Sequence, residues 1–443
     1  MSIKVGFVSL GCPKNTCDTE VMLGLLNERG FEIVSEDIYA DVMIINTCAF
    51  IKSAKEEAIE TILDVAYLKE HHNLKGIVVT GCLATRYAED IEKTLPEVDA
   101  ILSAGDEGKI CEAVEAAYKG EKYFSLSPTE NLAFGGDRVV TTPEYTAYLK
   151  IAEGCDNRCA YCSIPDIRGK FRSREMEDIM AEAHTLFDLG ARELCLVAQD
   201  TTRYGVDLYG KYSLDILLER LATECDFKWI RLLYCYPDKI TDSLISVMAK
   251  YDCIAKYIDM PIQHINERVL GVMNRHGGAE VIKSAVERLR RAMPDITIRT
   301  TVITGFPTET AEEAKELLDY VKNTRFERLG AFTYSREEDT PAYSMKGQVP
   351  EKTKQKRCDS IMEAQYKIHA ENNEKQIGKT LDVLVEGYDK VGEIYFGRTE
   401  MDAPEIDGKI YFSAKRRLRD GEFIKVRVTE VLDYDLMGSQ VEG

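Results

Sequence analysis

Three cysteines on one short segment are the strongest candidates in this chain for a chemical role. Cys155, Cys159 and Cys162 lie in the segment CDNRCAYC, with the spacing CxxxCxxC. Three thiolates on one loop can bind three irons of a cubane cluster and leave the fourth iron open to a small ligand. Structural cysteines or a zinc knuckle are the alternative, but zinc sites favour two CxxC pairs, and the chain has no second pair. The spacing therefore favours an iron–sulfur cluster.

Three more cysteines share a position relative to the predicted strands. Cys12, Cys48 and Cys82 each follow a short apolar run, at intervals of 36 and 34 residues (48 − 12 and 82 − 48). Loops at the carboxyl ends of parallel strands share one sheet edge, where ligands bind. Taken singly, each cysteine would be a small buried hydrophobic residue. Together they predict a second site, formed without a local motif.

The other seven cysteines have no mutual spacing. We interpret them as core or incidental residues: Cys17, Cys111, Cys195, Cys225, Cys235, Cys253 and Cys358. The odd total of 13 cysteines, partly in tight clusters, indicates metal binding or catalysis in place of a disulfide framework.

Apolar runs alternate with amphipathic stretches over residues 1–120, which predicts an open parallel α/β sheet. A first helix is expected from about Asp18 to Gly30, and a capping box at Ser53–Glu56 is expected to open a second that runs to about Lys69. The predicted strands are residues 5–10, 42–46, 77–80 and 98–102.

Two further domains are expected after a linker at residues 121–146, which is rich in Ser, Pro and Thr and contains the pair Gly135-Gly136. Residues 147–375 alternate strands and helices and predict a partial (β/α)6 barrel of the TIM type, with chemistry at the carboxyl ends of its strands. Its strands are expected at residues 147–152, 193–198, 229–233, 257–262, 297–303 and 329–334. Residues 376–443 hold short alternating strands and predict a small β-barrel of the OB type.

The CDNRCAYC loop resembles the signature of the radical S-adenosylmethionine (SAM) superfamily. That resemblance implies that the open iron chelates the amino and carboxylate groups of SAM, with Tyr161 on the adenine side. Segments SLGCPKN (9–15), NTC (46–48), TGC (80–82), RGK (168–170) and RSR (172–174) resemble the methylthiotransferase family within it. The family resemblance implies that Cys12, Cys48 and Cys82 bind a second [4Fe–4S] cluster and that the tail is a TRAM domain.

Segments after three barrel strands fit a SAM pocket, namely QDTT (199–202), MPIQH (260–264) and TGFPTE (304–309). Gln199, Asp200 and Gly305 are the predicted contacts, although glycine and proline after a strand often serve only a turn. For His264 a structural hydrogen-bonding role is favoured over contact with a ligand.

Insertion of sulfur at an unactivated C–H bond explains the need for two clusters. Removal of hydrogen from such a carbon is beyond side-chain acids and bases, whereas a low-potential cluster can reduce SAM to a radical that removes it. A second SAM would supply the methyl group. An external electron donor, such as flavodoxin or ferredoxin, is expected.

The length, the apolar runs and the net charge of the chain limit which compartment and which partners are possible. The 443 residues contain no apolar run long enough for a membrane span, and the N-terminus does not resemble a signal peptide, so we expect a cytoplasmic protein without membrane contact. The net charge of −19 is unfavourable for binding phosphates.

The family divides into enzymes that modify adenosine in tRNA and enzymes that modify an aspartate of a ribosomal small-subunit protein. SLGCPKN, QDTT and IPDIRG (164–169) resemble the second branch. Residues 374–443 hold 15 acidic and 11 basic side chains, net −4 (11 − 15), which suits a basic ribosomal protein. Lys415–Arg417 is a basic cluster within this acidic tail and would favour RNA. We interpret it as a solvated strand end. A tRNA-modifying enzyme and a non-catalytic iron–sulfur scaffold stay as alternatives.

Overall fold

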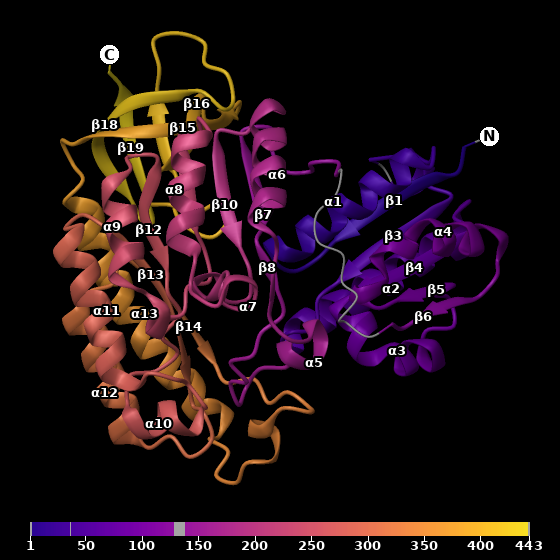
Figure 1. The fold of residues 1–443 in the computed structure, drawn as a ribbon, viewed down its shortest axis with the longest axis horizontal. Coiled ribbons are helices and arrows are strands. Elements are labelled where there is room, and N and C mark those ends of the chain that lie inside the picture. The colour runs from indigo at the N-terminus through magenta and orange to yellow at the C-terminus, as the bar shows by residue number, and fades with distance from the viewer. Residues whose placement is uncertain (1, 36, 128–137, 442–443) are drawn as a thin grey trace.

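Two six-stranded sheets, a closed barrel and a small two-stranded sheet make up the described part of the protein (Figure 1). The computed structural model describes residues 2–35, 37–127 and 138–441. An N-terminal sheet lies on the right of Figure 1, a central sheet on the left, and a small C-terminal barrel above the central sheet. Within the described ranges, no helix has the length and apolar character needed to cross a membrane.

The N-terminal sheet is parallel throughout, and crossover connections join its successive strands. Its spatial order is β2 (Glu32–Ile33), β1 (Lys4–Ser9), β3 (Val42–Thr47), β4 (Gly76–Gly81), β5 (Ala100–Leu102) and β6 (Tyr123–Ser125). Met43 and Ile45 of β3 pack with the helices α2 (Lys52–His71) and α3 (Cys82–Thr94). Val42 and Ile44 alternate to the other face, against α1 (Pro13–Glu28) and α4 (Ile110–Lys119). The prediction of an open parallel α/β sheet is confirmed.

Several predicted boundaries differ from the structure. Helix α1 begins at Pro13, five residues before the predicted start, because proline is well suited to the first helical position. The capping box predicted at Ser53 is wrong, since Ile51 is the N-cap of α2 and no side chain caps it. Strand β6 lies inside the predicted linker and pairs with β5. Residues 128–137 of that linker, with the pair Gly135-Gly136, lie outside the described residues.

The central sheet is a partial barrel of six parallel strands. Its order is β14 (Arg328–Thr333), β13 (Thr297–Thr304), β12 (Ile254–Asp259), β11 (Trp229–Leu232), β10 (Glu193–Val197) and β7 (Thr146–Lys150). Strand β12 ends before the predicted position, because Pro261 has no N–H with which to continue the ladder. The helices that cover it are α6 (Met176–Asp188), α8 (Leu214–Glu224), α9 (Asp242–Lys250), α11 (Gly278–Ala292), α12 (Ala311–Thr324) and α13 (Glu351–Glu374).

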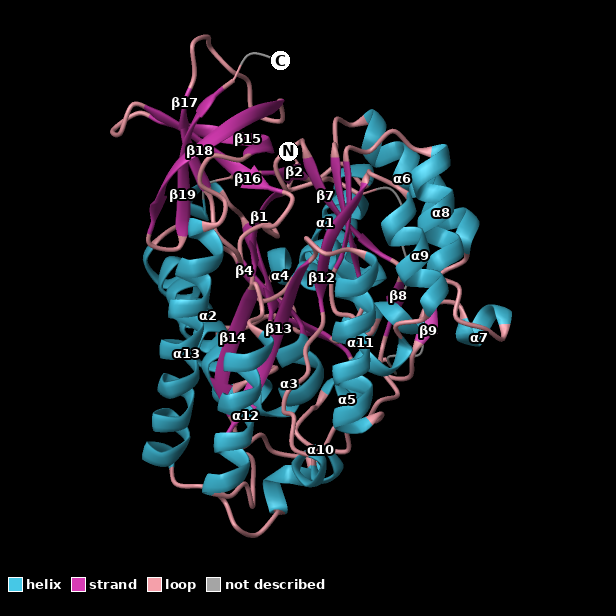
Figure 2. Ribbon diagram, turned by 90° about the vertical axis from the view of Figure 1, so that its left-hand side faces the viewer, coloured by secondary structure: helices cyan, strands magenta, loops and turns pink. Residues whose placement is uncertain are grey.

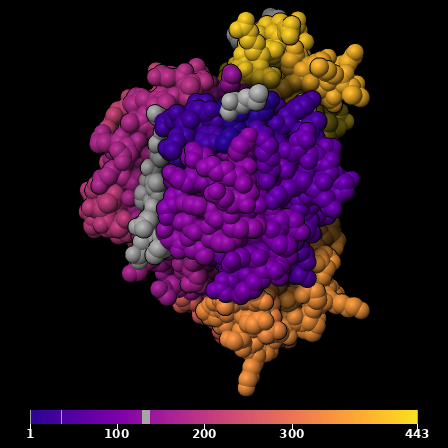
Figure 3. Space-filling model, turned by 90° about the vertical axis from the view of Figure 1, so that its right-hand side faces the viewer, coloured from indigo at the N-terminus to yellow at the C-terminus, as the bar shows by residue number. Residues whose placement is uncertain are grey.

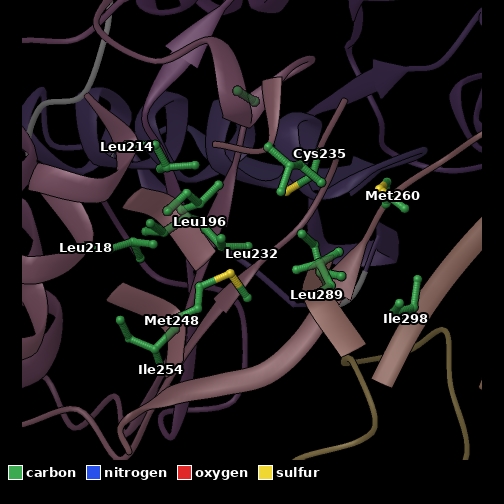
Figure 4. Packing of buried hydrophobic residues seen from close by; sticks show 14 of the residues in the cluster. Leu196, Leu214, Leu218, Leu232, Cys235, Met248, Ile254, Met260, Leu289 and Ile298 are labelled. Atoms are coloured by element: carbon green, nitrogen blue, oxygen red, sulfur yellow. The ribbon is translucent and has the colours of Figure 1, made fainter. Parts of the chain in front are cut away.

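The largest apolar cluster lies between these strands and helices. Figure 4 shows Leu196 and Leu232 from the strands next to Leu214 and Leu218 of α8, with Met248 of α9 close by. Short elements cap the carboxyl ends of the strands. They are the antiparallel pair of β8 (Ala152–Glu153) and β9 (Arg172–Ser173) and the helices α5 (Ile164–Arg168), α7 (Val206–Tyr209) and α10 (Glu267–Val272). The large core fixes the strands, and the strands fix the loops at their ends.

The C-terminal strands close into a five-stranded barrel, as the sequence predicts. Its order is β15 (Thr380–Asp389), β16 (Ile394–Thr399), β17 (Ile410–Ser413), β19 (Asp435–Gln440) and β18 (Phe423–Leu432). Strand β19 follows β18 through a tight turn at Asp433, a residue with φ of 53°. Figure 2 shows this barrel at the end of the central sheet opposite α10 and α5.

The N-terminal sheet packs across the open side of the central sheet. In Figure 3 its indigo and purple surface faces the viewer, with the orange segment that follows β14 directly below. Lys55 of α2 binds Glu337 of that segment at 2.7 Å, and Arg86 of α3 lies 3.5 Å from the same carboxylate. Both sheets thus present their carboxyl-end loops to one shared region.

Candidate functional site

The three N-terminal cysteines lie at one edge of the N-terminal sheet. Cys12 precedes α1, Cys48 follows β3, and Cys82 is the first residue of α3. Strands β1, β3 and β4 are neighbours in the sheet, so their carboxyl-end loops are adjacent. The three thiols are close enough for their charges to act on one another. The structure brings the predicted set together.

Two glycines make this close approach possible. Gly11 has φ of +98°, and a Cβ there would lie 2.9 Å from Cβ of Cys48. Gly81 has φ of +88°, and its Cβ would lie 2.3 Å from Oδ1 of Asn46. A side chain at either position would therefore strain the backbone and separate the loops that carry the thiols.

Arg168 reaches this thiol set from the central sheet. Its Nη2 lies 3.6 Å from Sγ of Cys82 and donates to Oδ1 of Asn15 at 2.7 Å. Burial raises the pKa of Cys82 to about 12, and the guanidinium of Arg168 opposes that rise. Burial also raises the pKa of Cys48. Ligation of iron must displace these protons, and the Arg168 cation favours the thiolate that results.

The CxxxCxxC loop follows the short strand β8 at the carboxyl end of the central sheet. The backbone N–H of Cys155 donates to O of Gly169 at 3.1 Å, and that of Cys162 donates to O of Cys159 at 3.0 Å. Burial raises the pKa of Cys155 to about 11 and raises the pKa of Cys162. The charges of the three thiols interact, so this set is also gathered.

Cys159 has two polar neighbours from other parts of the barrel. Arg275 Nη1 lies 3.9 Å from its Sγ, and the Tyr236 hydroxyl lies 3.8 Å from the same atom. The Arg275 guanidinium also stacks on the Tyr236 ring, 3.8 Å from its centroid. A guanidinium thus lies beside one thiol of this set, as Arg168 lies beside Cys82 of the other.

A buried ionic network joins the two thiol sets. Lys150 of β7 binds Asp18 of α1 and, at 2.9 Å, Glu153 of β8. Arg168 of α5 binds Asp18 at 2.7 Å and lies 3.6 Å from Glu153. Burial favours the neutral acid, but Lys150 and Arg168 outweigh it and lower the pKa of Glu153 to about 2. The four paired charges fix the N-terminal sheet against the central one at the level of the cysteines.

The residues predicted for a SAM pocket all lie on the rim that carries the CxxxCxxC loop. Tyr161 packs edge-on against Phe306, with ring centroids 6.4 Å apart. Gln199 donates to Glu153. Gly305 has φ of +70°, and its N–H donates to Glu309 at 2.8 Å. Nothing in these contacts tests the binding of SAM, so this assignment stays a prediction.

Asp200 has a positioning role that the sequence alone did not indicate. Its Oδ2 accepts from Asn157 of the CxxxCxxC loop at 2.8 Å and lies 3.2 Å from Nζ of Lys239. Its Oδ1 accepts from Thr202 at 2.7 Å. The side chain is 1% exposed. Asp200 therefore ties the cysteine loop to the ends of β10 and β11.

His264 takes the structural role that the sequence favours. It is fully buried, and its Nδ1 accepts the N–H of Asn266 at 2.9 Å. Burial lowers its pKa to about 4, so the ring is neutral at pH 7. All thirteen cysteines, including the seven outside the two sets, are free of disulfides.

Sequence reasoning missed the polar residues that support the thiols. Arg168 and Asn157 lie in segments that the family motifs cover, but their partners are distant in sequence. Arg275, Tyr236 and Lys239 lie in segments without a motif. The only available signal was the expectation that loops after barrel strands meet at one rim.

The two thiol sets fit iron–sulfur clusters by the chemistry of their donors. Each provides three free thiols and places an arginine beside one of them. In the described part of the chain, no three Cys, His, Asp or Glu side chains are close enough to share one metal ion. Each thiolate of a cubane binds a different iron, so a cluster does not require such a contact.

Three families match successive parts of the chain. Residues 4–103 match the family described as uncharacterized protein family UPF0004, residues 149–321 match the radical SAM superfamily, and residues 377–441 match the TRAM domain. A partial barrel with a CxxxCxxC loop at its rim and this superfamily match define the class of the protein, a radical SAM enzyme.

Curated relatives match over almost the whole chain. The ribosomal protein uS12 methylthiotransferase RimO of Desulforamulus reducens is 49% identical over 439 residues, 98% of each chain. The RimO of Pelotomaculum thermopropionicum is 49% identical over 443 residues, 100% of each chain, and that of Clostridioides difficile is 47% identical over 438 residues, 98% of each. The chain belongs to the RimO family of radical SAM methylthiotransferases, whose cofactors are SAM and [4Fe–4S] clusters.

Solved structures share the fold at low identity. The radical SAM methyltransferase TsrM from Kitasatospora setae, with cobalamin and a [4Fe–4S] cluster bound, aligns with a TM-score of 0.57 at 16% identity, over 77% of each chain. The cobalamin-dependent radical SAM enzyme OxsB aligns with a TM-score of 0.51 at 12% identity, over 83% of this chain and 58% of that one. An α/β sheet beside a partial barrel is thus an arrangement found in radical SAM proteins.

Proposed function

We propose that the chain inserts a methylthio group at the β-carbon of an aspartate in ribosomal protein uS12. The observation that selects this substrate is the identity of 47–49% to uS12 methylthiotransferases over nearly all of both chains. The acidic charge of the protein supports it, because a chain of net charge −19 attracts a basic ribosomal protein and repels RNA. Such a substrate places the enzyme in the cytoplasm.

In this proposal the cysteines of the CxxxCxxC loop hold one [4Fe–4S] cluster and Cys12, Cys48 and Cys82 hold the other. Tyr161, Gln199, Asp200 and Gly305 belong to the SAM pocket. When bound, the cofactors supply a SAM-derived radical, the sulfur and the methyl group, with electrons from a donor such as flavodoxin or ferredoxin.

The residues of the chain orient these groups. Asp200 and Asn157 fix the CxxxCxxC loop on the barrel rim. The buried network around Asp18, Lys150 and Arg168 holds the other thiol set against that rim. Transfer of sulfur to carbon would require a fixed separation between the two sets, and these contacts would maintain it.

Reconstitution of the holoenzyme tests this function. Anaerobic enzyme with SAM and dithionite is incubated with purified uS12 or with total tRNA, and both products are analysed by mass spectrometry. We expect one methylthio group on a single aspartate-containing peptide of uS12. Methylthiolated adenosine in tRNA together with unmodified uS12 would show that the tRNA alternative is correct. Failure to release 5′-deoxyadenosine would favour the non-catalytic scaffold.

A further inference from the structure

Lys14 places a buried cation between the two thiol sets. It is the second residue of α1 and follows Cys12 by two positions. The side chain is 8% exposed. Its ammonium lies over the ring of Tyr234, 3.4 Å from the centroid. An aromatic ring stabilises a cation above its face, but it does so less than a carboxylate at the same distance.

No carboxylate of the described residues lies within ion-pair distance of this ammonium, and the nearby acids have other partners. Asp18 binds Lys150 and Arg168, and Glu153 binds Lys150 at 2.9 Å. Removal of an unpaired charge from water is costly. The free-energy cost of burying the Lys14 charge is therefore not offset by a carboxylate, whereas the neighbouring cations Lys150 and Arg168 are paired.

The contact with Tyr234 locates Lys14 relative to the CxxxCxxC loop. Tyr234 has φ of 61°, an unfavourable value for a tyrosine, and two backbone hydrogen bonds hold it there, its N–H to Asp259 at 3.1 Å and its O from Thr201 at 3.1 Å. Two residues later, the Tyr236 hydroxyl lies 3.8 Å from Sγ of Cys159. One short segment thus touches Lys14 on the side of Cys12 and Cys159 on the other.

We propose that Lys14 binds the side-chain carboxylate of the target aspartate and thereby selects aspartate as the residue to be modified. This inference rests on the proposed function. The β-carbon is bonded directly to that carboxylate, so an ion pair at Lys14 holds the reacting carbon between the two thiol sets. Lys14 is a substrate-binding residue in this account, and it takes no part in radical formation.

Substitutions at Lys14, combined with a change in the substrate, test the inference. Lys14→Met removes the charge at similar volume, Lys14→Arg keeps it, and Lys93→Met is the matched control on an exposed lysine of α3. Each reconstituted enzyme is assayed for the KM of uS12 methylthiolation. Each is also assayed for binding of uS12 and of a uS12 variant with asparagine at the modified position, by fluorescence anisotropy.

Loss of a charge-assisted hydrogen bond should raise the KM of Lys14→Met roughly 10- to 100-fold. Wild-type enzyme should bind the aspartate form more tightly than the asparagine form, Lys14→Met should bind the two equally, and Lys14→Arg should restore much of the preference. Lys93→Met should behave as wild type. The Lys14→Met protein should unfold at no lower temperature, because it loses an unpaired buried charge.

Three results would overturn the inference. An unchanged KM and an unchanged preference for aspartate in Lys14→Met would remove Lys14 from substrate binding. A shifted reduction potential of the N-terminal cluster with an unchanged preference would mean that Lys14 only balances the charge of the thiolates. A lower melting temperature would indicate a structural role. If wild-type enzyme leaves uS12 unmodified, the proposed function itself fails.

Discussion

Replacement of Glu193 by glutamine should weaken the junction between the central sheet and the C-terminal barrel. Glu193 is fully buried on β10, 2.8 Å from Arg231 Nε and 2.6 Å from Arg398 Nη2. Arg398 belongs to β16, so this carboxylate ties the two sheets together. Burial favours the neutral acid, but Arg398 and Arg231 outweigh it and lower the pKa of Glu193 from 4.5 to about 2.

Two routes give the magnitude of this effect. The lowered pKa corresponds to about 3 kcal/mol of stability at pH 7, and removal of one partner from a buried ion pair costs about 3–5 kcal/mol. We therefore expect Glu193→Gln to lose about 3 kcal/mol. Because the pKa is lower in the folded state, the contribution is present above pH 4.5 and is lost as the pH falls toward 2. At pH 3 the difference from wild type should shrink by more than half.

Trp229 is a natural reporter of this junction. It is the only tryptophan of the chain and packs edge-on against Phe423 of the C-terminal barrel, with ring centroids 4.8 Å apart. Its fluorescence in urea titrations at pH 7 and pH 3 gives the unfolding midpoints. The control is Glu177→Gln, which removes an exposed pair with Arg220 and should barely move the midpoint. A Glu193→Gln shift as small as that of the control, or equal shifts at both pH values, would refute the reasoning.

Further predictions concern the cysteines, Arg168 and the tail. Changing the three cysteines of the CxxxCxxC loop to alanine should leave about four irons per chain and abolish release of 5′-deoxyadenosine; continued release would refute the radical site. Changing the three N-terminal cysteines should abolish methylthiolation but leave some SAM cleavage, and retained methylthiolation would exclude the second cluster. Arg168→Met should lower stability by about 3 kcal/mol or more and weaken retention of the N-terminal cluster, measured by calorimetry and iron content; unchanged values would contradict the network. Lysine at the exposed Glu393, Asp420 and Glu430 should weaken uS12 modification while SAM cleavage is unchanged.

The sequence predicted elements wherever a local pattern decides the structure. The strands that precede Cys12, Cys48 and Cys82 are apolar runs, fully buried in β3 and β4, and their shared edge follows from parallel topology. The predicted ends of helices and strands were wrong where a single backbone group decides them, as at Pro13 for α1 and at Pro261 for β12.

The polar support of the site was outside the reach of sequence patterns. Asp18, Lys150 and Arg168 meet only because two sheets pack together, and each residue alone would pass for a solvated charge. Lys14 is similar, since its lack of a carboxylate partner is visible only when the neighbouring acids are assigned to other cations. Long-range packing, with no local motif, creates these contacts.

Isotope transfer tests the central claim most directly. Purified uS12 carrying aspartate deuterated at the β-carbon is incubated with the reconstituted enzyme, SAM and dithionite, and the 5′-deoxyadenosine released is analysed by mass spectrometry. The account predicts deuterium in 5′-deoxyadenosine, together with one methylthio group on the same uS12 peptide and one deuterium lost from it. Unlabelled 5′-deoxyadenosine with uS12 unmodified, or a methylthio group at a carbon other than the labelled one, would contradict it.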